Sequence, residues 1–207
     1  RPGGGLFLLN HPGYSLEATD ILDGKFDGGS ILQPCLHWDG ERILFSYTAD
    51  AGRTFSPGEM DNERDEGCYH LWTVRTDGTG LKQLTAGAFD DLMPAWLPDG
   101  NAVFCSTRRK GYSRCFGDAF SRRWHTYTLH HLTMDDGSIT RLSSNDVSEW
   151  FPVVGNDGLI YYSRWDYIDR DAVTHQTLWS SRPDGTNPMA VWGNGLPSPH
   201  CTFQIQP

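Results

Sequence analysis

The stretch Pro94-Ala-Trp-Leu-Pro-Asp-Gly100, followed by Ala102-Val-Phe-Cys-Ser106, decides the fold of this chain. An Asp-Gly pair between two apolar runs predicts a β-hairpin, because glycine readily adopts the positive φ that such a turn requires. The same pattern returns at Asp39-Gly40 and at Asp157-Gly158. Self-similarity of this kind indicates a repeat architecture.

A second hairpin follows the first in every repeat, with its turn at Asp77-Gly78, Asp136-Gly137 or Asp184-Gly185. Each repeat therefore carries four strands, which we name A, B, C and D in chain order. A four-stranded antiparallel sheet repeated along the chain is typical of a β-propeller blade. The fold class is all-β, a partial propeller with about three full blades and a partial blade at each end.

The blades are expected over residues 30–85, 86–142 and 143–192, with partial blades over 1–29 and 193–207, so that 1–207 is a single propeller segment. Propellers need at least four blades to close a ring, and open sheet edges invite pairing with other strands. We therefore expect the native protein to continue on both sides. The chain begins at Arg1 and shows no targeting signal, which fits a piece of a longer protein.

Composition narrows the range of partners. The formal net charge of -9 argues against a general surface for nucleic acid or anionic membranes. No apolar run approaches the ~20 residues of a membrane span, so we expect no membrane insertion. A basic stretch over 108–114 and 122–124 is expected to be a solvated loop. Five cysteines, an odd number, give no complete disulfide framework.

The extra length of each repeat falls between strands B and C, over residues 47–69, 107–126 and 164–177. Strands alternate in direction, so the B–C and D–A connections emerge on the same face of the propeller, which we call the B–C face. Long irregular connections in a compact fold are usually functional. The B–C face is therefore the expected functional surface.

Charged and aromatic side chains gather on the B–C face, at the starts of A strands and the ends of B strands. Guanidinium groups bind anions in a planar, bidentate manner, and indoles stack on sugars or cations. Alternatively, the carboxylates and guanidinium groups pair with one another and fix the packing of neighbouring blades. The candidate ligand-binding residues are Asp90, Asp91, Arg108, Arg109, Glu149, Trp150, Arg164, Trp165 and Asp166.

A metal site is a further hypothesis, because thiolate and imidazole groups are good ligands for zinc or copper. The candidates are Cys68, His70, Cys115 and His125, although their spacing matches no known site. A disulfide between Cys68 and Cys115 is the alternative in an oxidising compartment, and two reduced surface thiols are another. Cys35 and Cys105 lie within predicted strands and are expected to be buried.

No catalytic motif is present in the sequence. Ser163 lacks the Gly-x-Ser-x-Gly context of a hydrolase nucleophile, and no glycine-rich phosphate loop links a strand to a helix. Asp90 and Asp91 are adjacent, which does not give the opposed geometry of a glycosidase. We assign no catalytic residue, and the segment is expected to be non-catalytic.

Several phrases resemble known propellers. Trp96–Gly100 and Gln83-Leu-Thr85 are similar to the PD40 repeats of TolB-type propellers. The stretches Asp90–Gly100, Tyr161–Tyr167 and Pro183–Asn187 resemble the middle domain of the hydrazine synthase alpha subunit. These resemblances imply a β-propeller fold and a periplasmic or cell-surface location, and they say little about chemistry.

Hydrazine synthase works through covalently attached c-type haem, whose attachment requires Cys-x-x-Cys-His. The sequence contains no such motif, so no haem is attached to this segment. The expected function is that of a non-catalytic binding or scaffold segment of a larger bacterial extracytoplasmic protein. It would bind a protein partner, other domains of its own chain or a small polar ligand. The alternative is a segment of a redox or carbohydrate-active enzyme.

Overall fold

The computed structural model describes residues 4–50, 67–111, 113, 125–167, 175–196, 198 and 201–206, which form strands and turns without an α-helix. Three four-stranded antiparallel sheets follow one another, each in the order A–B–C–D, after a two-stranded hairpin. This confirms the expected partial propeller. Those residues contain no helix that is long and apolar enough to cross a membrane.

The strands have the following bounds. The hairpin consists of β1 (Phe7–Leu9) and β2 (Ala18–Asp20). The first blade contains β3 (Ser30–Leu36), β4 (Arg42–Thr48), β5 (His70–Arg75) and β6 (Lys82–Gln83). The second contains β7 (Asp91–Trp96), β8 (Ala102–Ser106), β9 (Thr128–Leu132) and β10 (Ile139–Arg141). The third contains β11 (Glu149–Val154), β12 (Ile160–Trp165), β13 (Gln176–Ser181) and β14 (Met189–Trp192).

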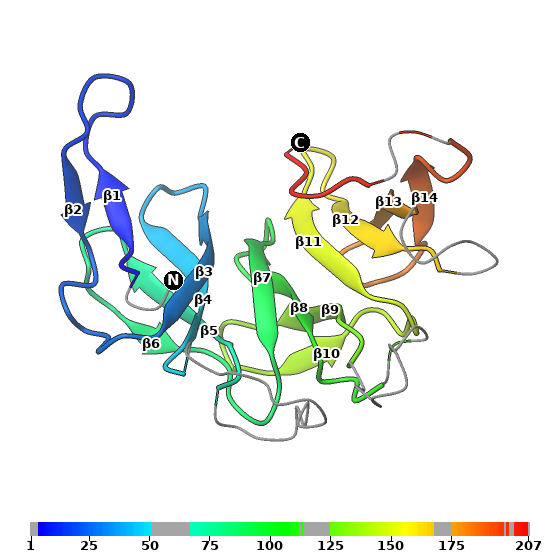
Figure 1. Cartoon of the computed structure of the whole chain (residues 1–207), viewed down its shortest axis with the longest axis horizontal. Coiled ribbons are helices and arrows are strands. Elements are labelled where there is room, and N and C mark those ends of the chain that lie inside the picture. The colour runs from blue at the N-terminus through cyan, green and yellow to red at the C-terminus, as the bar shows by residue number, and fades with distance from the viewer. Residues whose placement is uncertain are drawn as a thin grey trace.

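The three blades form an open arc (Figure 1). Their A strands lie innermost, where β3 contacts β7 and β7 contacts β11. Their D strands, β6, β10 and β14, form the outer edges. The starts of the A strands and the ends of the B strands therefore meet at the joints between blades, on the B–C face.

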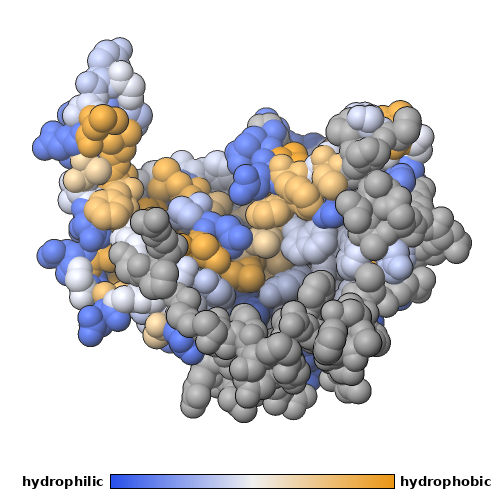
Figure 2. Space-filling model, in the orientation of Figure 1, coloured by the Kyte–Doolittle hydropathy of each residue, from blue (hydrophilic) through white to orange (hydrophobic). Residues whose placement is uncertain are grey.

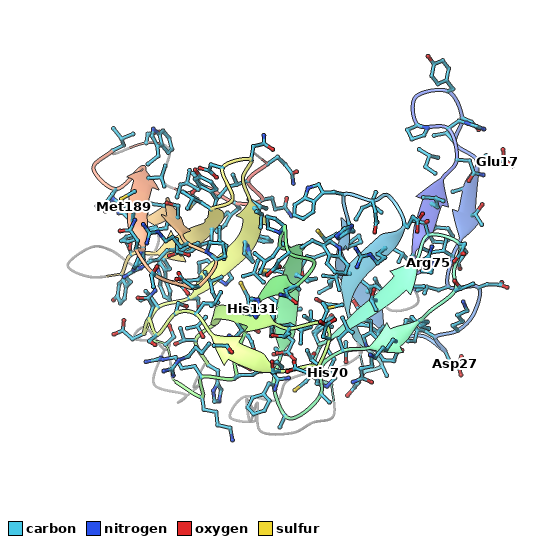
Figure 3. All side chains as sticks on the ribbon, turned by 180° about the vertical axis from the view of Figure 1, so that it is seen from behind. Glu17, Asp27, His70, Arg75, His131 and Met189 are labelled. Carbon is cyan, nitrogen blue, oxygen red and sulfur yellow. The ribbon has the colours of Figure 1, made fainter. Side chains whose placement is uncertain are left out.

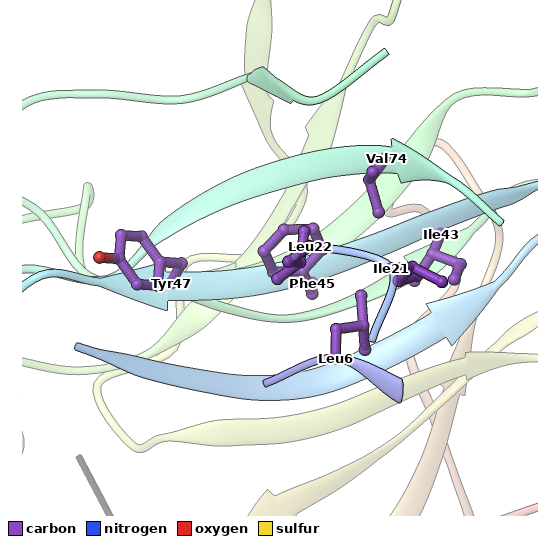
Figure 4. Close-up of a cluster of buried hydrophobic side chains, with 7 residues drawn as sticks. All are labelled: Leu6, Ile21, Leu22, Ile43, Phe45, Tyr47 and Val74. Carbon is purple, nitrogen blue, oxygen red and sulfur yellow. The ribbon is translucent and has the colours of Figure 1, made fainter. Parts of the chain in front are cut away.

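Apolar side chains fill the space between successive sheets, and one such cluster packs the N-terminal segment onto the first blade (Figure 4). It contains Leu6, Ile21, Leu22, Ile43, Phe45, Tyr47 and Val74. A second cluster, around Leu71, Trp96 and Phe104, joins the first blade to the second. A third, around Val103, Leu129 and Tyr162, joins the second blade to the third. Alternate residues of β8 thus serve two different joints, as the two-residue period of a strand requires.

Each A strand contains a β-bulge just before its proline, which the register shifts reveal. The residues before the prolines, Gln33, Met93 and Phe151, all have positive φ, between 49° and 57°. Gln33 Oε1 accepts a hydrogen bond from the Met93 amide at 3.1 Å, and Met93 Sδ accepts one from the Phe151 amide at 3.3 Å. The bulge residues therefore form a ladder that links the three blades.

Two of the Asp-Gly turns also hold blades together. Both Gly78 and Gly185 have positive φ, and a Cβ at either would lie within 2.5 Å of a carbonyl oxygen of the preceding segment, that of Ile21 or Leu142. Glycine is therefore needed at both positions for two reasons: the positive φ of the turn, and the close approach of two backbones, which leaves no room for a Cβ.

Tryptophans recur near the hairpins, and this repetition predicts inter-blade core positions for Trp38, Trp72, Trp96 and Trp179. Trp96 is 2% exposed, and Trp72 and Trp179 pack partly buried against apolar clusters. The expectation is wrong for Trp38, which is 62% exposed. Trp38 occupies the A–B turn at the place of Pro98, since the amides of Gly40 and Gly100 close the equivalent turns on His37 and Leu97.

The ends of the described chain expose apolar surface. Figure 2 shows this on the projecting β1–β2 hairpin, where Phe7 is 60% exposed. At the other end, Cys201 forms a parallel bridge to Gln176, and the Thr202 amide donates to the Gln176 carbonyl at 2.9 Å. This contact at the start of β13 is equivalent to those of Asp91 and Glu149, whose amides donate to the Tyr69 and Tyr127 carbonyls at the starts of β5 and β9.

Candidate functional site: buried carboxylates and an aromatic group on the B–C face

Asp91, the first residue of β7, is fully buried at the joint between the first two blades. Its carboxylate accepts hydrogen bonds from Ser106 Oγ at 2.7 Å and from Arg108 Nε and Nη2 at 2.9 and 2.7 Å. Arg108 also donates to the Ala86 carbonyl at 2.7 Å, in the connection from the first blade. The Asp91–Arg108 pair therefore fixes the second blade against the first.

His70 at the start of β5 lies on the other side of this carboxylate, with Nδ1 3.8 Å from Asp91 Oδ2. Figure 3 labels His70 and Arg75, the two ends of β5. Burial alone would raise the pKa of Asp91, but the interactions with His70, Arg108 and Ser106 outweigh it and lower the pKa. Asp91 is therefore a stably ionised group.

Asp90 has a different environment from its neighbour. It accepts hydrogen bonds from the Tyr69 amide at 3.0 Å and from the Tyr127 hydroxyl at 3.2 Å. Burial raises the pKa of Asp90, against the effect of these donors. Burial also raises the pKa of Tyr127 well above its ordinary value, so the phenol stays protonated and remains a donor.

Glu149, the first residue of β11, repeats the position of Asp91 at the next joint and is also fully buried. Ser143 Oγ and Asn145 Nδ2 donate to its carboxylate from the connection that leaves the second blade. The Leu129 amide donates at 3.3 Å. Burial raises the pKa of Glu149, and these hydrogen bonds together with the charge of Arg164 oppose that rise.

Arg164 and Asp166 lie at the end of β12. Arg164 Nε is 3.4 Å from Asp166 Oδ1, and the guanidinium group stacks 4.2 Å from the centre of the Trp179 ring. Trp179 Nε1 donates to Asp166 Oδ2 at 3.1 Å. A small polar cavity of about 150 Å³ adjoins this group and Glu149.

The aromatic candidates form a group with two residues that the sequence analysis did not single out. Trp150 and Trp165 stack with ring centroids 6.4 Å apart, and Tyr167 stacks on Trp165 at 5.4 Å. Phe203 lies edge-on to Trp150 at 6.1 Å and is 45% exposed. We call these four residues the aromatic group.

Arg109 does not join the carboxylates. It lines an open hollow beside the second blade, together with Phe89, His130 and Arg141. Adjacent residues of a strand point to opposite faces of the sheet, and His131, next to His130 in β9, lines a different hollow.

The metal hypothesis stays a prediction because Cys115 falls outside the described residues. Cys68 and His125 are buried, and His70 lies beside Asp91. Within the described ranges, no three His, Cys, Asp or Glu side chains are arranged to hold a metal ion. The expected burial is confirmed for Cys105, whose thiol pKa is raised well above the ordinary value by burial, whereas Cys35 is only partly buried.

Tyr127, Ser143 and Asn145 are among the contacts of the candidate carboxylates that the sequence analysis did not identify. One signal was present for Ser143. It follows β10 as Thr85 follows β6, and both hydroxyls accept the amide of a C-strand leucine at 2.9 Å. Tyr127 contacts Asp90, which is distant in the sequence, and Asn145 lies in an irregular connection. A strand pattern indicates neither contact.

Comparison with known proteins supports the fold. No protein-family model matches the chain. A TolB homolog from Chlorobium luteolum is 26% identical over 147 residues, which cover 54% of this chain and 33% of that protein. The chain thus spans about a third of the length of this relative.

Solved structures give the same picture. Hydrazine synthase of Kuenenia stuttgartiensis matches with a TM-score of 0.62 and 16% identity, over 86% of this chain and 27% of that one. TolB from Acinetobacter baumannii matches with a TM-score of 0.55 and 9% identity, over 87% and 36%. A puromycin hydrolase matches with a TM-score of 0.52 and 18% identity, over 79% and 22%. The TolB-like resemblance is confirmed, and at these identities the structural likeness concerns the fold alone.

Proposed function

We propose that this chain is a non-catalytic propeller segment that binds a protein partner through its B–C face, within a larger extracytoplasmic protein. The observation that carries this proposal is the aromatic group. Trp150 and Trp165 are only partly buried, near the ends of β11 and β12, and the sheet holds them in place. Phe203, which packs against Trp150, is 45% exposed. Partly exposed, pre-ordered aromatic side chains are the residues that most often dominate protein interfaces.

The buried carboxylates support the same interpretation. Asp91 and Glu149 are fully buried, and donors from the second blade and from the connection that leaves it satisfy them. They hold the blades together, so the aromatic group remains as surface that can contact a partner. The resemblance to TolB supports a binding role and an extracytoplasmic location.

Site-specific photo-crosslinking in the native host tests this proposal. A photoreactive amino acid in place of Tyr167 is expected to give a discrete protein adduct, because Tyr167 stacks on Trp165 at the edge of the aromatic group. The matched control replaces Trp38, which is 62% exposed on the opposite face. Adducts of the same pattern and yield from both positions, or from position 38 alone, would contradict the proposal.

A double substitution, Trp150→Ala with Trp165→Ala, provides the reciprocal test. The adduct formed through position 167 should decrease at least tenfold, since truncated hot-spot residues typically cost ~2 kcal/mol or more of binding. Circular dichroism of the purified variant establishes that the sheets remain. An unchanged adduct in a folded variant would place the interface elsewhere.

A further inference from the structure

The hollow beside the second blade has a volume of about 500 Å³, within the range of small-ligand sites. Among the described residues, six line the hollow, with no acidic residue and with three arginines, of which Arg108 is paired with Asp91: Phe89, Arg108, Arg109, His130, Ile139 and Arg141. Such a concentration of positive charge is unexpected in a chain of net charge -9. We propose that this hollow binds a small organic anion, a carboxylate or phosphate attached to an apolar group.

The repeat itself shows why the hollow exists. His130 pairs with Phe104 across the strands, as Trp72 pairs with Phe45 and Trp179 with Tyr162. His130 therefore stands where the other two blades carry a tryptophan. An imidazole is much smaller than an indole, so the second blade has space at this position.

A second departure from the repeat enlarges the same space. Ser106 pairs with Asp91, as Arg164 pairs with Glu149 in the third blade. In the third blade, the Arg164 guanidinium lies 4.2 Å from the centre of the Trp179 ring and fills the position. The serine of the second blade hydrogen-bonds to Asp91 instead. In the third blade, Trp179 and Arg164 fill this space. The second blade has the smaller His130 and Ser106 at the same two positions.

The positive charge is also specific to this blade. Arg141 lies across the strands from His130, at a position that holds Gln83 in the first blade and Ala190 in the third. Among the described residues, neither Arg141 nor Arg109 has a carboxylate within 4 Å, so their charges are not neutralised there.

Arg108 gives the hollow a fixed wall. Its Nε and Nη2 are held by Asp91 and the Ala86 carbonyl, and its guanidinium group lies 4.9 Å from the centre of the Phe89 ring. Lys110 Nζ lies 5.4 Å from the same ring. A site with a rigid apolar wall and several cations around it favours a ligand that carries both an oxyanion and an apolar group.

His130 adds a polar atom of a different kind. Its Nδ1 lies 2.9 Å from the Thr128 carbonyl and donates to it, which leaves Nε2 as the acceptor of the ring. Burial lowers the pKa of His130, so the imidazole is neutral near pH 7. The cationic character of the hollow therefore comes from its guanidinium groups and not from the imidazole.

Isothermal titration calorimetry of the whole 207-residue chain tests the site. Phenyl phosphate and benzoate are the two anionic probes, and benzyl alcohol is their neutral counterpart. Binding of either anion, with none of benzyl alcohol, supports the proposal and identifies which oxyanion the site prefers. Binding of neither anion, or equal binding of benzyl alcohol, overturns it.

Two variants tie binding to the hollow. Arg141→Gln should weaken the binding of the preferred anion at least tenfold, since a hydrogen bond to a charged group contributes at least this much. The matched control is Arg182→Gln, an exposed arginine in a C–D turn on the opposite face, which should leave affinity unchanged. Equal affinity of wild type and Arg141→Gln overturns the proposal.

His130→Trp restores the residue of the other two blades and should fill the hollow. The variant is expected to remain folded, because two blades of the same chain accept tryptophan at this position, and to lose anion binding. Retained binding in folded His130→Trp overturns the proposal. Partner crosslinking through position 167 should be unaffected by both variants, which separates this site from the proposed protein interface.

Discussion

At the scale of single residues, Asp91 is a buried ionised group that stabilises the joint between the first two blades. It is fully buried, and its carboxylate accepts hydrogen bonds from Ser106 and Arg108. Asp91→Asn keeps the shape of the side chain but leaves the Arg108 guanidinium without its counter-charge. Removing one partner of a buried ion pair costs roughly 3–5 kcal/mol, and we expect a loss of this size in the free energy of unfolding measured with urea.

The control at the same scale is Asp39→Asn. Asp39 pairs with Arg42 at 2.8 Å on the solvent-exposed A–B turn. Water screens an exposed ion pair, so Asp39→Asn should lower the free energy of unfolding far less than Asp91→Asn does. Equal losses for the two variants would show that Asp91 does not hold the joint.

At the scale of strands, the bulge ladder predicts an unusual difference between two apolar substitutions. Gln33→Leu removes the acceptor of the Met93 amide and should lower the free energy of unfolding by about 1–3 kcal/mol. Gln33→Met should cost less, because Met93 Sδ already accepts the Phe151 amide in the next joint. Urea unfolding compares the two variants, and the ladder is contradicted if they are equally stable.

The strands also show what a sequence pattern can and cannot predict. The Asp-Gly pairs predicted the hairpins and the order of strands, because turn chemistry and apolar alternation are local properties. The ladder through Gln33, Met93 and Phe151 was not predicted, since a residue before proline is not expected at positive φ. Trp38 was misplaced because it lies two residues beyond the position of Trp96, in the turn itself, where the second blade has Pro98.

The candidate site was predictable in part for the same reason. Chain direction placed Asp91 and Arg108 at one end of the second blade, and the structure joins them in an ion pair. The sequence could not show that the pair is buried, nor that His130 opens a hollow beside it. Both depend on which side chains neighbouring blades bring to a joint.

At the scale of the whole molecule, the three joints differ in kind. Ile31 occupies the position of Asp91 and Glu149 in the first blade, because it pairs with Tyr47 as they pair with Ser106 and Arg164. The joint to the N-terminal segment is accordingly apolar, whereas the other two each contain a buried carboxylate. The stability of the arc should therefore depend on pH through its carboxylate joints.

Asp91 and Glu149 have opposite effects on how the stability of the fold depends on pH. The pKa of Asp91 is lowered in the folded state, so its contribution is full above the ordinary aspartate pKa of 3.8 and is lost as the pH falls through the folded pKa. The pKa of Glu149 is raised in the folded state, mainly by burial. The folded protein therefore binds a proton at Glu149 that the unfolded chain has released, which stabilises the fold as the pH decreases toward 4.5.

Glu149→Gln isolates the second effect, since the amide keeps the size of the side chain and does not titrate. The free energy of unfolding of wild type minus that of Glu149→Gln should increase as the pH is lowered from 8 toward 4.5. Each unit by which folding raises the pKa contributes about 1.4 kcal/mol to that increase. Urea unfolding across this range measures the difference. A difference that is constant, or that increases with pH, would mean that Glu149 is as well stabilised in its ionised form at the joint as it is in water.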